Sequence, residues 1–162
     1  MSKHLTIANF NAMEKLHKQF EDKLCTLLSF LTQLPCELDM IADEIDNENL
    51  KNALSAVAIE SNQYAKELAD QLRSLAIRPP LAEVVNFQDA FFVQDPRATH
   101  MKGEEVLDIC ERVETFFTRL YSEAMNEYFP NNSLNDMMNY QLLGIRSAFM
   151  RIRFLNSLRF RN

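Results

Sequence analysis

The chain has 162 residues, a length that fits one domain able to bury a sizeable core without disulfides or metal ions. It holds only 2 Gly and 5 Pro beside 47% hydrophobic residues, which favours helices over a turn-rich all-β fold. Its net charge of -6 argues against nonspecific binding to nucleic acid or anionic lipid, because both attract proteins of the opposite charge.

The composition also bears on the environment of the protein. No uncharged apolar run reaches the roughly 18 residues that a membrane span needs, so no span is expected. The three cysteines, Cys25, Cys36 and Cys110, are odd in number and lack metal-ligand spacing. They predict a reduced, cytoplasmic chain, and no cofactor is expected.

Four amphipathic stretches, with apolar residues at steps of three and four, follow one another at residues 9–45, 48–77, 103–129 and 132–160. Pro35 interrupts the first stretch without shifting its phase, which predicts one bent helix. Asn47 is expected to cap the second helix through its side-chain oxygen, and Pro79-Pro80 is expected to end that helix.

The connections between these stretches predict the topology. Short turns make the first and second helices, and the third and fourth, antiparallel neighbours. The long crossover at residues 78–102 lets the second and third helices run parallel. We therefore predict a single-domain, all-α four-helix bundle over residues 1–162 with one long crossover, the arrangement of ferritin-like folds. The apolar segment 84–93 is expected to pack on the bundle or to form part of an oligomer interface.

Charge placement agrees with this topology. Six acidic residues and no basic one lie from Glu37 to Glu48, whereas five arginines and no acid follow Asp136. In a one-crossover bundle, the turn between the first two helices and the end of the fourth lie at the same end. Attraction between them would support this register, although the arginines could equally favour the dipole of their own helix.

Polar residues on or beside apolar helix faces are the candidates for a functional site. They are Glu60, Glu111, Glu114 and Gln141. A half-buried carboxylate needs a hydrogen-bond donor, a cation or a metal ion, because an unpartnered one is costly. Counting outward from the first turn places Glu60 opposite the region of Gln33.

The same counting from the second turn places Glu111 and Glu114 opposite Arg146 to Arg151, so a Glu–Arg pair could fill the interior. We expect the four residues to be structural, either paired or at the rim of the bundle. A weak metal site and a small-ligand pocket are the alternatives.

Histidines argue against the metal alternative. Metal pairs in such bundles use Glu on two helices and Glu-x-x-His on the other two. Glu14-x-x-His17 matches that string, but it lies near the end of the first helix and is expected to be exposed; His4 and His100 fall outside the helices. No metal site is expected. If one exists, its oxygen ligands would hold iron or manganese weakly, and the candidates are Glu60, Glu111, Glu114 and Gln141.

Three short motifs resemble a known family. Residues 60–68 (ESNQYAKEL), 47–51 (NENLK) and 110–114 (CERVE, with valine where glycine is expected) are similar to the second helix, the turn and the third helix of small bacterial ferritin-like proteins of unknown function, distant relatives of YciE and YciF. The resemblance implies a ferritin-like bundle and no established activity. By the broader ferritin pattern it places Glu60 and either Glu111 or Glu114 at carboxylate positions, Gln63 at a histidine position, and Gln141 and Gly144 on the fourth helix.

The expected function is therefore interaction rather than catalysis. We expect a homo-oligomer that binds neither nucleic acid nor a membrane, built on a scaffold without its metal ligands. The alternative is a residual metal-dependent oxidase or metal-handling protein with Glu60, Glu111, Glu114 and Gln141 as ligands, to which His17 could be added.

Overall fold

The computed structural model describes residues 7–78, 103–126 and 132–158, and within these ranges the chain forms helices and no strand. The helices are α1 (Ile7–Asp43), α2 (Glu48–Ser74), α4 (Gly103–Asn126) and α5 (Asn132–Leu158). Every start and end lies within three residues of the position predicted from the apolar spacing. The crossover at 79–102, with its apolar segment 84–93, lies outside the described residues, as do His4 and His100.

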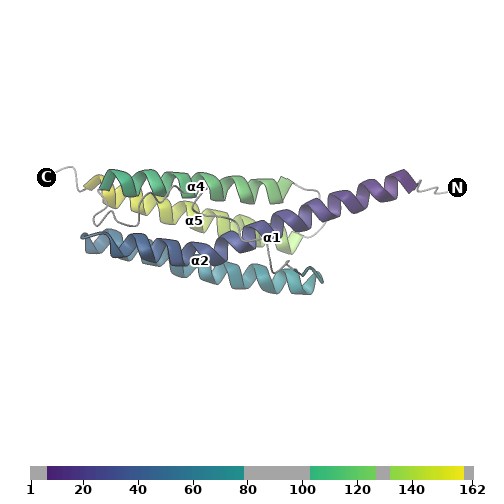
Figure 1. Cartoon of the computed structure of the whole chain (residues 1–162), viewed down its shortest axis with the longest axis horizontal. Helices are drawn as coiled ribbons and strands as arrows, with labels where there is room; N and C mark the ends of the chain where they lie inside the picture. The colour runs from purple at the N-terminus through teal and green to yellow at the C-terminus, as the bar shows by residue number, and fades with distance from the viewer. Residues whose placement is uncertain (1–6, 79–102, 127–131, 159–162) are drawn as a thin grey trace.

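The four described helices pack side by side as a bundle (Figure 1). α1 and α5 each pack against both α2 and α4. α2 and α4 run in one direction, and α1 and α5 run in the other (Figure 1). Contacts of α4 with α5 agree, because Glu114 meets Arg153 whereas Tyr121, two turns later, meets the earlier Gln141. The second and third helices of the prediction, α2 and α4, therefore run parallel as expected.

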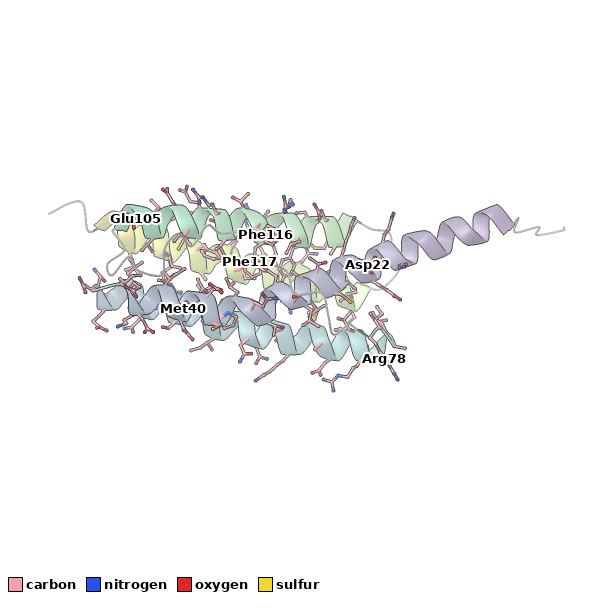
Figure 2. The ribbon with its side chains drawn as sticks, in the orientation of Figure 1. Asp22, Met40, Arg78, Glu105, Phe116 and Phe117 are labelled. Carbon is pink, nitrogen blue, oxygen red and sulfur yellow. The ribbon has the colours of Figure 1, made fainter. Side chains whose placement is uncertain are left out.

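Helix α1 is continuous through Pro35, as the unbroken phase of its apolar stripe predicted. It changes direction between Asp22 and Met40, the stretch that contains Pro35 (Figure 2). Proline leaves a carbonyl of the preceding turn without its N–H partner and crowds the backbone there, which accounts for a bend. The first turns of α1 project beyond the ends of α4 and α5 (Figure 1).

One part of α1, Lys18–Asp43, is long and apolar enough to cross a membrane by length and composition. The core helix of a soluble protein passes the same test, and Phe20, Leu24 and Leu27 of this part are buried in the bundle. It is the one such stretch in the described ranges, so the structure contains no clear membrane span there.

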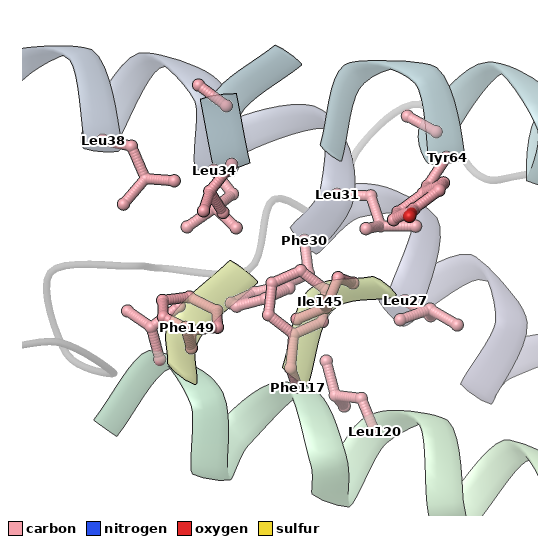
Figure 3. Close-up of a cluster of buried hydrophobic side chains, with 14 of the residues drawn as sticks. Leu27, Phe30, Leu31, Leu34, Leu38, Tyr64, Phe117, Leu120, Ile145 and Phe149 are labelled. Atoms are coloured by element: carbon pink, nitrogen blue, oxygen red, sulfur yellow. The ribbon is translucent and has the colours of Figure 1, made fainter. Parts of the chain in front are cut away.

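Apolar side chains from all four helices meet along the axis of the bundle (Figure 3). Phe30 of α1 packs edge-on against Phe117 of α4, with ring centroids 4.4 Å apart, and Phe117 stacks on Tyr121 at 5.9 Å. Each fully buried side chain of this size contributes about 1.5–3 kcal/mol relative to exposure. The core therefore arises from the same three- and four-residue spacing that predicted the helices.

The two ends of α2 differ in how well the sequence predicted them. Asn47 caps its start, because the side-chain oxygen accepts a hydrogen bond from the Leu50 N–H at 3.0 Å, as expected. The helix ends at Ser74, before the predicted Ile77. Ala76 adopts a left-handed conformation with φ 58, and the Ile77 N–H bonds back to the Leu72 carbonyl. A local left-handed cap therefore ends α2, ahead of the prolines that were expected to do so.

The acidic turn between α1 and α2 lies at the same end of the bundle as the C-terminal end of α5 (Figure 1). This is the register that the charge distribution predicted. Among the described residues no ion pair joins the two regions. The arrangement agrees with attraction between the two regions, and Arg159 and Arg161 of the basic region lie outside the described residues.

Candidate functional site

Gln141 is fully buried at the meeting point of three helices. The Tyr121 hydroxyl of α4 donates to Gln141 Oε1 at 2.7 Å. Gln141 Nε2 donates to Glu67 Oε2 of α2 at 3.0 Å and to the Tyr64 carbonyl at 3.4 Å. Burial raises the pKa of Tyr121, so its hydroxyl stays protonated and acts as the donor. The prediction that Gln141 points inward is confirmed, and its hydrogen bonds connect α2, α4 and α5.

Two members of this network, Tyr121 and Glu67, were not predicted. Tyr121 follows Phe117 by four residues and lies on the same inward face of α4. Glu67 stands three residues after Tyr64, at the edge of the buried face of α2. Both positions could have been found from helical spacing, but the partner that joins them comes from a third helix.

Glu114 forms a two-pronged ion pair with Arg153 of α5. Arg153 Nη1 binds Glu114 Oε2, and Nη2 donates to Oε1 at 3.3 Å. The Glu114 side chain is 14% exposed and that of Arg153 is 38% exposed. The predicted Glu–Arg pair is therefore present, but the choice of Arg146 or Arg151 as partner was wrong, and both are exposed. Counting from a turn gives height along a helix and leaves open which face a side chain lies on.

Glu111, which the helical spacing places at the edge of the apolar face, is exposed on α4. Each helical residue turns the side chain by about 100°, so Glu111 lies a full step beyond the buried Cys110. Burial raises the pKa of the Cys110 thiol to about 12, and the Glu114 carboxylate adds to this effect while Arg153 opposes it. The interior beside Glu111 is thus apolar and keeps its thiol protonated.

Glu60 faces α5 rather than α1, so the expected position opposite Gln33 is also wrong. Gln33 Nε2 donates to Ser29 Oγ on its own helix at 2.8 Å. Glu60 Oε2 is buried and has no hydrogen-bond partner among the described residues. Helix α5 packs against α2 on the face that carries Glu60.

A cavity of about 300 Å³ lies between α2 and α5 next to Glu60. Tyr64 forms one wall, and its ring meets that of Tyr140 edge-on at 6.4 Å between centroids. Gly144 leaves room for this wall, because a Cβ atom there would lie 2.2 Å from the Tyr64 hydroxyl oxygen. The cavity is lined by Ala53, Ala56, Glu60, Tyr64, Tyr140, Leu143, Gly144, Ser147, Ala148 and Arg151.

The electrostatics of the cavity keep its tyrosine neutral. Burial raises the pKa of Tyr64 to about 12, and the negative charge of Glu60 adds to the effect, followed by smaller contributions from Tyr140 and Glu67. The Tyr64 hydroxyl is protonated at neutral pH and can donate a hydrogen bond, and Glu60, whose Oε2 has no partner among the described residues, lines the same cavity. This combination can accommodate a ligand that donates hydrogen bonds.

The four candidate ligands do not meet at one point. Glu111 is exposed, Glu114 is held by Arg153, Gln141 is held by Tyr121, and Glu60 lies in the cavity between α2 and α5. Among the side chains that the structure describes, no group of three His, Cys, Asp or Glu lies close enough to hold a metal ion. Glu14 and His17 belong to α1, but their side chains lie outside the described residues.

A comparison of the chain with known protein families, with curated proteins and with solved structures finds no match. The resemblance to the small bacterial ferritin-like proteins stays a prediction from three short sequence motifs.

Proposed function

We propose that this protein is a ferritin-like bundle that acts by assembly, and that it pairs with a second copy through the outer face of α5. The helix order and the parallel course of α2 and α4 support the ferritin-like part. The residues on the outer face of α5 support the assembly part, and they carry the proposal.

The outer face of α5 exposes a stripe of large apolar side chains. Tyr140, Leu143, Met150 and Phe154 are 67%, 66%, 64% and 61% exposed, and the exposed Ser147 lies between the two pairs. Successive members are three or four residues apart in alternation, the spacing by which one helix packs along another. Single exposed apolar residues are ordinary, but a continuous row of them marks an interaction surface.

A second copy fits this stripe because the order of its side chains is the same from either end. It runs aromatic, apolar, small, apolar, aromatic, from Tyr140 through Ser147 to Phe154. A twofold axis at Ser147 would place Tyr140 against Phe154 of the other copy and Leu143 against Met150. Symmetric dimers require such a self-complementary surface, in which two residues exchange partners across the axis.

Sedimentation velocity of the full chain over a range of concentrations tests this assembly. We expect a reversible dimer in the wild type. Met150→Ser combined with Phe154→Ser should weaken dimerisation roughly 100-fold or more, because two apolar anchors are lost from each copy. A helical circular dichroism spectrum would show that the variant is folded.

Ile59→Ser is the matched control. Ile59 is 71% exposed on α2, an apolar side chain outside the α5 stripe, so its loss should leave the dimer unchanged. A wild type that stays monomeric at the highest concentration would overturn the proposal. So would a dimer that the double variant leaves intact.

The cysteines support a cytoplasmic location for this assembly. Cys36 is exposed and Cys110 is buried, and neither forms a disulfide, the state expected in a reducing compartment. Alkylation of protein taken directly from cells, followed by mass spectrometry, should label the exposed Cys36 completely. Oxidised Cys36 in such a sample would contradict this location.

A further inference from the structure

We propose that the cavity between α2 and α5 binds a small zwitterion of the amino-acid type, with its protonated amine at Glu60 and its anionic group at Arg151. This inference goes beyond assembly and rests on a different observation, an unpartnered carboxylate beside an open cavity. Tyr140, Leu143 and Ser147 belong both to the α5 stripe and to the lining of the cavity, so a dimer would border this site. A monomeric variant that keeps these three residues separates the two proposals.

The carboxylate of Glu60 is the proposed position of the amine. Its Oε2 is buried without a hydrogen-bond partner among the described residues, and the Glu60 residue lines the cavity. Leaving a buried acceptor unpaired costs about 1–3 kcal/mol, and more when the group is charged. A protonated amine supplies both the N–H donors and the positive charge that this oxygen lacks.

The walls of the cavity suit the same group. Tyr64 and Tyr140 lie edge-on to each other at its side, and aromatic rings attract cations that approach their faces. The Tyr64 hydroxyl is neutral at physiological pH, so it adds no charge that would compete with Glu60. A volume of about 300 Å³ is at the lower end for ligand sites, which restricts the ligand to a small molecule.

Arg151 accounts for the anionic group of the proposed ligand. It lines the same cavity, is exposed, and forms no ion pair with a described carboxylate. A ligand with only an amine would be repelled by Arg151, and one with only a carboxylate would be repelled by Glu60. Glu60 and Arg151 form no ion pair with each other. A molecule that carries both an amine and an anionic group would therefore compensate both charges.

Titration of the full chain, followed by two-dimensional NMR, tests the site. The probes are glycine, β-alanine and 4-aminobutanoate, each compared with its matched simple amine and carboxylic acid. We expect at least one zwitterion to shift signals around Tyr64 and Tyr140 and to bind about 10-fold or more tightly than its matched amine or acid. Equal or absent binding of all the probes would overturn the proposal, because the cavity would then hold only solvent.

Two conservative variants assign the charges. Glu60→Gln should weaken the zwitterion and the simple amine about 10-fold and strengthen the simple acid, because the repulsion by Glu60 is removed. Arg151→Gln should weaken the zwitterion and the simple acid about 10-fold and strengthen the simple amine. Glu111→Gln removes an exposed carboxylate of α4 and is the matched control. If Glu60→Gln and Glu111→Gln have equal effects, binding is nonspecific and the assignment is wrong.

The assembly variant separates the two proposals. Met150 and Phe154 do not line the cavity, so the Met150→Ser, Phe154→Ser double variant should bind the zwitterion as a monomer. Loss of binding in this variant, with Tyr64 and Tyr140 signals otherwise in place, would mean that the cavity does not form a site within one chain.

Discussion

The two flanks of α5 each bring one glutamate near one arginine, with different results. On the α4 flank, Glu114 and Arg153 form a two-pronged pair. On the α2 flank, Glu60 and Arg151 line one cavity without a pair between them, and an oxygen of Glu60 has no partner among the described residues. Gln141 lies between the flanks and is satisfied from both sides. A buried carboxylate is thus compensated within the bundle on one flank and left for a ligand on the other.

The largest effect should come from Gln141, which links the two flanks. Gln141→Leu keeps the approximate volume but leaves the buried Tyr121 hydroxyl and the Glu67 carboxylate without their shared partner. We expect a loss of about 2–3 kcal/mol in the free energy of unfolding, measured by urea denaturation. A loss below about 0.5 kcal/mol would mean that water replaces the amide and that the flanks are independent.

Arg153→Met should have the next largest effect. It leaves Glu114, with only 14% of its side chain exposed, without a cation. Breaking a fully buried pair costs about 3–5 kcal/mol, but Arg153 is 38% exposed, so we expect about 1–2 kcal/mol. In a double-mutant cycle with Glu114→Gln the two losses should not add. Additive losses would show that the pair contributes nothing as a unit.

Glu60→Gln should change the free energy of unfolding differently from Glu114→Gln. Glu114→Gln removes half of an ion pair, whereas Glu60→Gln removes a charge that has no partner. We expect Glu60→Gln to leave stability unchanged or to raise it by up to about 1 kcal/mol in protein free of ligand. Destabilisation equal to that of Glu114→Gln would remove the distinction between the flanks.

The smallest effect concerns the titration of Tyr64. Its pKa is raised to about 12, first by burial and then by the Glu60 charge. Because the folded pKa exceeds the ordinary tyrosine value of 10.0, the stability that this tyrosine contributes is complete below pH 10 and is lost as the pH rises toward 12. Glu60→Gln should lower the Tyr64 pKa while leaving it above the ordinary value for tyrosine, because burial still raises it, as ultraviolet difference titration would show. An unchanged pKa would place Glu60 outside the cavity.

Helical periodicity was enough to predict much of this architecture. The apolar stripes predicted the helices, and the two short turns and the long crossover predicted their directions. Gln141 was found because it stands among apolar residues at helical steps. The end of α2 was missed since Ala76 takes a left-handed conformation that glycine usually marks in a sequence.

Partners across helices were harder to predict. Arg151 and Arg153 are near one height on α5, yet their side chains turn to opposite flanks, which counting from a turn does not resolve. The neighbour of Glu60 depended on the order of helices around the bundle. The outer stripe from Tyr140 to Phe154 is visible in the sequence, but a second apolar row on one helix can be assigned to a surface only after the core row is known.

Gly144 has a consequence for how this chain can vary. The Tyr64 hydroxyl fills the space that a Cβ atom at position 144 would occupy, so the two positions share one volume across two helices. Related sequences should therefore vary at positions 64 and 144 together: a tyrosine would require glycine opposite, and an alanine opposite would accompany a ring without the hydroxyl. Covariation between these two positions would be a record of helix packing left in the sequences themselves.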